Sequence, residues 1–126
     1  MTISCTRAIP ILRLFDEAMT KEFYLEFLEF ELVFEHRFDD KAPLYMGVKK
    51  GDCVLHLSGH FGDGSPGAAV RIETTDLDAY AALLHGKQYK HARPGAPQSQ
   101  EWGCRELSLQ DPSANKLIFY VDVPRT

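Results

Sequence analysis

The spacing of apolar residues changes from strand-like to helix-like and back within the first half of the chain. Residues 8–15 (AIPILRLF) are apolar and typical of a β-strand. After Asp16, a residue suited to a helix N-cap, apolar side chains recur near helical spacing at Ala18, Phe23, Phe27 and Phe30. Three further strands are expected at residues 32–38, 44–49 and 53–58. The pattern predicts the order β, α, β, β, β.

The same order begins again after the glycine-rich segment 60–67 (HFGDGSPG). A strand is expected at residues 69–74, followed by a helix at 77–84 with Asp76 as its N-cap and Gly86 as a left-handed residue that ends it. The remaining strands are expected at residues 89–92, 104–110 and 116–123. A Pro/Gly loop reaches Gln100, and residues 111–115 form a tight turn.

The two halves share the same expected order of strands and helix, although their amino-acid sequences differ. A shift of 60 positions places Leu12 on Ile72, Asp16 on Asp76 and Leu57 on Leu117. A single βαβββ unit would leave one sheet face uncovered and its edge strand unpaired, a liability that a second unit can remove. We therefore expect an α+β fold in one domain, residues 1–126. Two βαβββ modules, about 8–60 and 68–123 and joined by segment 60–67, would form a curved mixed sheet around a cleft.

Composition narrows the class of protein. The chain has 126 residues, of which 44% are hydrophobic and 25% charged, as expected of one globular domain. The longest apolar runs are about five residues, whereas ~20 are needed to cross a bilayer. Residues 1–7 lack the features of a secretory signal, so a cytoplasmic protein with no membrane partner is expected. The three cysteines (Cys5, Cys53 and Cys104) have no CxxC spacing, which favours reduced thiols.

The net charge of the chain indicates which classes of binding partner are favoured. The formal net charge of −4 disfavours nucleic acid, whose binding needs a basic surface to displace counterions. The same charge suits a cationic ligand.

Two stretches of sequence resemble a known superfamily. The opening AIPILRLFD and the segment 102–121 (WGCRELSLQDPSANKLIFYV) are similar to the glyoxalase, bleomycin-resistance and extradiol dioxygenase superfamily, also called vicinal oxygen chelate. The motif Trp102-Gly103-x-Arg105-Glu106 followed by Asp111-Pro112-x-x-Asn115 resembles bleomycin-resistance proteins in particular. Ala114 stands where that family usually has glycine, which leaves the turn free to take a different conformation.

The resemblance also supplies a test for metal chemistry. Metal-dependent members carry ligands at four strand positions facing the cleft, which align here with Ile9, His56, Ala69 and Ile118. Three of these side chains have no lone pair to donate, and a single imidazole does not hold a catalytic metal. We therefore expect no metal, no cofactor and no catalytic residues. A metal-dependent lyase, isomerase or thiol transferase of the same superfamily remains the alternative, including one with a rearranged metal site.

Strand alternation from these positions divides the side chains between two faces. The helix-facing set is apolar and comprises Leu12, Leu14, Leu55, Leu57, Val70, Ile72, Leu117 and Phe119. The cleft-facing set includes Ile11, Arg13, Glu73 and Tyr120. The residues expected to bind ligand are Phe34, Phe38, His56, Ser58, His60, Phe61, Asp63, Arg71, Trp102 and Gly103.

The resemblance implies a role for these residues. Trp102 matches the tryptophan that the family places beside the bound antibiotic, and partial exposure is expected for it. Bleomycin-type antibiotics carry a flat bithiazole and a cationic tail. The bithiazole needs aromatic faces for stacking, and the tail needs carboxylates nearby. Phe34 has plain core packing as its alternative. Glu73 and Glu106 are expected instead to form ion pairs with Arg71, Arg105 or Arg13.

The function implied is resistance by sequestration: a bleomycin-type cationic glycopeptide is held without chemical change. The resemblance implies a homodimer with grooves at its interface, and exchange of units between the chains is left open. The alternative partner is another small, planar aromatic metabolite.

Overall fold

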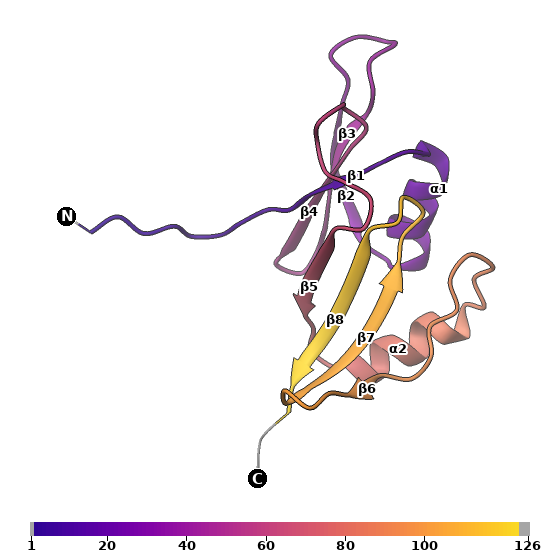
Figure 1. Cartoon of the computed structure of the whole chain (residues 1–126). Coiled ribbons are helices and arrows are strands. Elements are labelled where there is room, and N and C mark those ends of the chain that lie inside the picture. The colour runs from indigo at the N-terminus through magenta and orange to yellow at the C-terminus, as the bar shows by residue number, and fades with distance from the viewer. Residues whose placement is uncertain (1, 124–126) are drawn as a thin grey trace.

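The computed structural model describes residues 2–123 and confirms the α+β class (Figure 1). The first half contains β1 (Ile11–Arg13), α1 (Glu17–Lys21) continued by the π-helical turn η1 (Glu22–Phe27), β2 (Glu31–His36), β3 (Tyr45–Lys50) and β4 (Cys53–Ser58). The second half contains β5 (Ala69–Glu73), α2 (Leu77–Gly86), β6 (Gln98–Ser99), β7 (Cys104–Gln110) and β8 (Lys116–Asp122). Both halves therefore have the βαβββ order.

The strands form two four-stranded sheets of matching topology, in the orders β1-β4-β3-β2 and β5-β8-β7-β6. In each sheet the first strand pairs in parallel with the last, and the other neighbours are antiparallel. Both sheets are therefore mixed, as expected for this fold.

The strand expected at residues 89–92 is absent, and this prediction was wrong. The ring of Tyr89 instead stacks on Phe27, with centroids 4.7 Å apart, and the next two residues, Lys90 and His91, form a turn. The last edge strand is β6, which pairs with β7 beyond Pro94 and Pro97. Anchoring of the Tyr89 ring, a long-range contact, outweighs the local strand preference.

The structure agrees better with the predicted starts of the two helices than with the predicted end of the second helix. Asp16 caps α1, since its carboxylate accepts a hydrogen bond from the Met19 N–H at 2.8 Å. Asp76 occupies the N-cap of α2 but lies at φ +49° and makes no capping hydrogen bond through its side chain. The expectation for Gly86 was wrong: α2 includes it, and Gln88 at φ +49° is the left-handed residue that follows.

The predicted core face is confirmed. Seven of its eight members are buried, and Val70 is half-buried: the buried ones are Leu12, Leu14, Leu55, Leu57, Ile72, Leu117 and Phe119. They join apolar side chains of η1 and α2 in one core cluster that draws on both halves. The two helices lie on the same side of the molecule in Figure 1.

The turn at residues 111–115 ties the second half to the first. The Tyr24 hydroxyl donates to the Asp111 carboxylate at 2.6 Å, and the Asn115 side-chain amide donates to the Arg13 carbonyl at 2.8 Å. Both Asp111 and Asn115 are buried. Ala114 lies at φ +66°, in the left-handed region that glycine favours. Part of the motif that carries the family resemblance therefore has a structural role.

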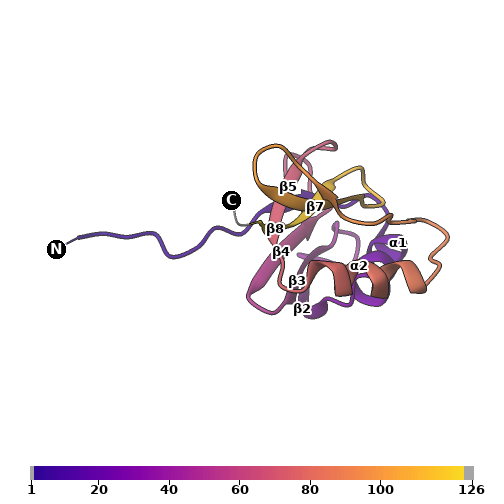
Figure 2. The ribbon, with the colours of Figure 1, turned by 90° about the horizontal axis from the view of Figure 1, so that it is seen from below.

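The segment before β1 runs away from the body in both Figure 1 and Figure 2, and residues 2–8 are exposed. Within residues 2–123, no helix combines the length and apolarity needed to span a membrane.

Candidate functional site

Three aromatic side chains meet on the outer face of the first sheet, the face opposite the core. The Phe34 ring from β2 lies 6.0 Å from the Tyr45 ring of β3 and 5.2 Å from the His56 ring of β4, measured between centroids. Phe34 is 37% exposed, so plain core packing, its alternative, does not describe it. Phe34, Tyr45 and His56 therefore form an open aromatic surface.

Gly47 makes room for this surface. It is paired with Phe34 on β2 and with His56 on β4. A Cβ atom at position 47 would lie only 2.4 Å from Cε1 of Phe34. The absence of a side chain thus lets the Phe34 ring lie flat over β3.

The polar atoms of the cluster are also paired. The Tyr45 hydroxyl oxygen lies 2.7 Å from Nδ1 of His56. Burial, with the positive charge of Arg7, lowers the pKa of His56, and burial raises the pKa of Tyr45. Both groups are therefore neutral at pH 7, so this surface offers ring faces rather than charge.

A second aromatic group lies at the end of β2. Phe38 is 75% exposed, and its ring makes edge contacts with His36, at 4.6 Å, and with His60, at 5.4 Å. His60 begins the segment between the modules, so this contact joins β2 to that segment. Phe38 and His60, two residues expected to bind ligand, therefore do lie together.

Ser58 and Asp63 form a polar pair beneath that segment. The Ser58 hydroxyl donates to the Asp63 carboxylate at 2.8 Å and accepts the His60 N–H at 3.1 Å. Ser58 is fully buried and Asp63 is half-buried. Ser58 therefore orients the Asp63 carboxylate. Because Ser58 is itself buried, its effect on a ligand is indirect and is exerted through Asp63.

The second sheet holds Trp102 at its surface through Glu106. The indole N–H donates to Oε2 of Glu106 at 2.9 Å, and the Arg71 guanidinium donates to the same oxygen at 2.8 Å. Arg71 also lies over the Tyr120 ring, 4.4 Å from its centroid. The expected ion pair of Glu106 is confirmed, and so is the partial exposure of Trp102, at 56%.

The hydrogen bond from Trp102, followed by the contact with Arg71, holds the pKa of Glu106 below its usual value. Gly103, at φ +88°, makes the turn between Trp102 and β7. Glu106 therefore stays ionised and serves as a fixed acceptor for the indole.

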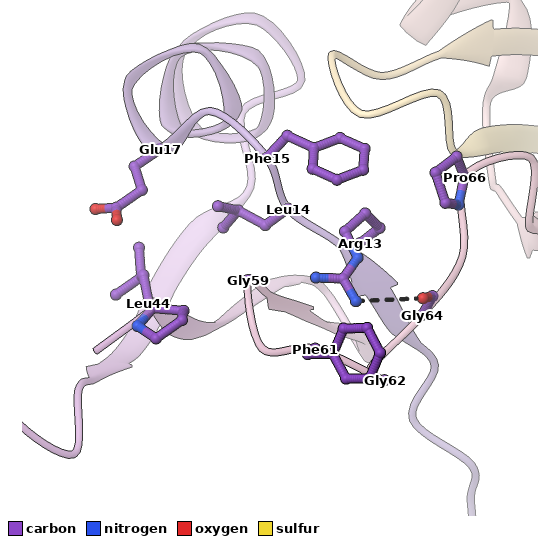
Figure 3. A pocket seen from close by; sticks show the side chains of 11 residues that line it. Arg13, Leu14, Phe15, Glu17, Leu44, Gly59, Phe61, Gly62, Gly64 and Pro66 are labelled. Carbon is purple, nitrogen blue, oxygen red and sulfur yellow. Dashed lines mark hydrogen bonds between the residues drawn. The ribbon is translucent and has the colours of Figure 1, made fainter. Parts of the chain in front are cut away.

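The remaining predicted residue, Phe61, lies on the segment between the modules. It is fully exposed and lines a pocket with Arg13 and Phe15 (Figure 3). This pocket contains none of Phe34, His56 or Trp102. The predicted residues thus fall into three places: the outer face of each sheet and the segment that joins them.

The donor set does not fit a metal ion. Ile9, Ala69 and Ile118, three of the four positions at which the family resemblance places metal ligands, supply no donor atoms. Across the part of the chain that the structure describes, no three His, Cys, Asp or Glu side chains are placed to hold a metal. We therefore derive no chemical step through a metal.

Two residues of the first aromatic surface, Tyr45 and Gly47, were not expected from the sequence. Alternation along residues 44–49 does put both on one face of a strand. Only the register of β3 between β2 and β4 shows that this face carries Phe34 and His56. A strand-pairing argument is thus the signal that could have found them.

Comparison with known proteins agrees with this fold. A family model described as "Glyoxalase superfamily protein" matches residues 1–124. No curated protein matches the chain. TnmS3, an antibiotic-binding protein from Streptomyces sp. CB03234, is 25% identical, with coverage of 99% of both chains and a TM-score of 0.73.

Two further solved structures concern bleomycin. A bleomycin-binding protein in complex with bleomycin is 26% identical, covers 94% of this chain and 99% of its own, and has a TM-score of 0.72. A bleomycin resistance determinant encoded on the transposon Tn5 is 25% identical, covers 94% and 98%, and has a TM-score of 0.72. Since the family model spans nearly all of its residues, the chain belongs to the glyoxalase superfamily.

Proposed function

We propose that this protein binds an antibiotic of the bleomycin type, with a flat aromatic part and a cationic tail, and withholds it without chemical change. The observation that carries the proposal is the exposure of three aromatic rings: Phe34 on the outer face of the first sheet, Phe38 just beyond the end of β2, and Trp102 just before β7. Exposed groups of large apolar side chains are typical of binding sites. A similar protein solved in complex with bleomycin, and a similar protein described as a bleomycin resistance determinant, support the same ligand class.

A single carboxylate, Asp63, is the group we infer to attract the cationic tail. Asp63 is held by Ser58, and its charge adds to burial in raising the pKa of Tyr45, so this carboxylate lies near the first aromatic surface. On the second sheet, Arg71 is paired with Glu106. Glu106 is neutralised by Arg71, so it is a weaker candidate for the tail than Asp63. We assign Asp63 as the carboxylate that attracts the tail.

We further propose that the groove is completed by a second copy of the chain. The ring contacts of Phe34 and Phe38 stay within the first half, and the polar contacts of Arg71 and Glu106 stay within the second. A ligand that touches both groups would therefore lie between the first sheet of one protomer and the second sheet of its partner. Edge strand β2 offers apolar surface for that contact, since Leu32 and Val33 are both exposed.

The test is a titration of the purified protein with bleomycin, followed by the fluorescence of Trp102 and by calorimetry. We expect saturable quenching at micromolar drug, one molecule bound per chain, and recovery of chemically unchanged drug by mass spectrometry. Absence of both quenching and heat would remove the antibiotic and leave another planar ligand as the candidate. Stoichiometric zinc, nickel or iron in the same sample, or a modified drug, would instead favour an enzyme of the superfamily.

A further inference from the structure

Arg13 is a buried cation whose partners in the structure are neutral. It lies in β1, is only 8% exposed, and hydrogen-bonds to carbonyl oxygens: Nη2 to His60 at 2.8 Å and to Gly64 at 3.4 Å, and Nη1 to Ser58 at 3.4 Å. Among residues 2–123, none of the salt bridges includes Arg13. Arginine is rarely buried without a carboxylate, so this charge calls for a counter-ion.

The guanidinium borders a pocket of about 540 Å³ (Figure 3). The Phe15 ring lies 5.7 Å from the guanidinium carbon, and in Figure 3 the Phe61 ring lies on the other side of that group. Both rings are exposed. The pocket therefore combines one buried positive charge with two exposed aromatic faces.

Gly64 allows close packing beside this pocket. A Cβ atom at position 64 would lie 2.7 Å from the Arg13 nitrogen of the main chain, so the segment between the modules packs directly on β1. Gly64 also lies at φ +70°, which L side chains rarely adopt. The segment to which the Arg13 side chain donates its hydrogen bonds is therefore held in place by close backbone packing on β1.

The other charged residue in the lining, Glu17, already has a partner. Its carboxylate is bound by Arg37, and this hydrogen bond lowers the pKa of Glu17. Glu17 is therefore ionised and paired at pH 7, and it does not compensate Arg13.

We propose that this pocket binds an organic anion with a flat apolar body, of the aromatic carboxylate class. A guanidinium has five N–H donors in a geometry that matches a carboxylate, so the three contacts with carbonyls leave donors for a ligand. The ring of the ligand would lie against Phe15 and Phe61. The site differs from the proposed antibiotic groove in its lining and in the sign of the charge it accepts.

The experiment is an NMR titration of ¹⁵N-labelled protein with benzoate, benzamide and inorganic phosphate. Benzoate should shift the amide signals of Gly59, Gly62 and Gly64 in a saturable way, with an affinity at least tenfold higher than that of benzamide or phosphate. Equal affinity for benzamide or phosphate, or benzoate shifts confined to other parts of the chain, would overturn the proposal. Bleomycin takes no part in the measurement, so its outcome is independent of the proposed antibiotic binding.

Variants test the two components separately. Phe61→Ala removes an exposed ring and should weaken benzoate binding about threefold to tenfold. Arg13→Gln removes the charge and should abolish the preference for benzoate over benzamide. Arg93→Gln, the same change at an exposed arginine outside the pocket, should leave benzoate affinity unchanged.

If the Arg13→Gln variant does not fold because the segment between the modules loosens, two other results test the proposal. They are the benzoate affinity of Phe61→Ala and the ratio of benzoate affinity to benzamide affinity in the unaltered protein. Unchanged benzoate affinity in Phe61→Ala would contradict the proposal, as would an equal loss in Arg93→Gln.

Discussion

Single side chains decide how the exposed aromatic groups are presented. An indole at a surface samples several rotamers, and a ligand that stacks on it must restrict that motion at a cost in free energy. Here Trp102 is tied to Glu106, which is itself bound by Arg71, and Arg71 lies over Tyr120. Much of the ordering of the indole is thus complete before any ligand arrives.

This arrangement predicts the effect of Glu106→Ala. Without its acceptor the Trp102 indole should become mobile, seen as lower fluorescence anisotropy and a weaker near-ultraviolet circular dichroism signal. Bleomycin affinity should fall about threefold to tenfold, the cost of immobilising one side chain on binding. Glu101→Gln, at an exposed neighbouring acid, is the control and should change neither signal. A mobile indole with unchanged drug affinity would show that Glu106 does not position Trp102 for binding.

Ala114 gives a second prediction at this scale, on stability. Its φ of +66° is costly for a residue with a Cβ atom and costs glycine little. Ala114→Gly should therefore raise the free energy of unfolding by ~0.5–1 kcal/mol, measured by urea denaturation, after allowance for the greater chain entropy of glycine. Ala82→Gly in the exposed part of α2 is the matched control and should lower it by a similar amount. Destabilisation by Ala114→Gly would contradict this account of the turn.

At the scale of strands and helices, alternation predicts the faces of β1, β4, β5 and β8 correctly, and it fails on β2. Leu32 pairs with Val48 and Phe34 with Gly47, so the register shifts between them and Val33 is the extra residue. Simple alternation puts Leu32 and Phe34 on one face, but the bulge turns Phe34 to the outer face beside Tyr45. Local sequence does not encode this bulge in a readable way, which is why core packing and ligand contact were equally open for Phe34.

The pairing of Phe34 with Gly47 predicts that Gly47→Ala displaces the Phe34 ring. Because the ring is at the surface and can swing away, we expect a change in unfolding free energy below about 1 kcal/mol. Ring-current shifts of Tyr45 and His56 should change, and bleomycin affinity should fall about threefold. In a Phe34→Ala background the second substitution should have no further effect on affinity. Unchanged ring-current shifts in the single variant would show that β3 accommodates the methyl group without moving Phe34.

For the whole molecule, the sequence predicts the two modules but not which way their outer faces point. The turn at residues 111–115 and the shared core set that arrangement through contacts between residues far apart in the chain, such as Tyr24 with Asp111. The contacts of the exposed Phe34 and Phe38 rings stay within the first module and the ion pair of Glu106 within the second, which is why the groove is proposed to lie between two chains. Family resemblance implied such a dimer, whereas spacing along the sequence did not.

In the proposed groove between two chains, ligand binding would depend on association, which Val33→Glu tests. Val33 is exposed on edge strand β2, so a charge there should leave the protomer folded while preventing a second copy from covering the strand. Since a stable dimer buries about 1,200–2,000 Å² in total, a charge on an apolar strand within the proposed interface is expected to shift the protein to monomer in sedimentation velocity.

Bleomycin binding should be lost with the dimer if the groove lies between the two chains. Leu83→Glu, a similar change at an exposed leucine of α2, should keep both the dimer and the binding. A monomeric Val33→Glu variant that still binds bleomycin with full affinity would place the whole groove within one chain.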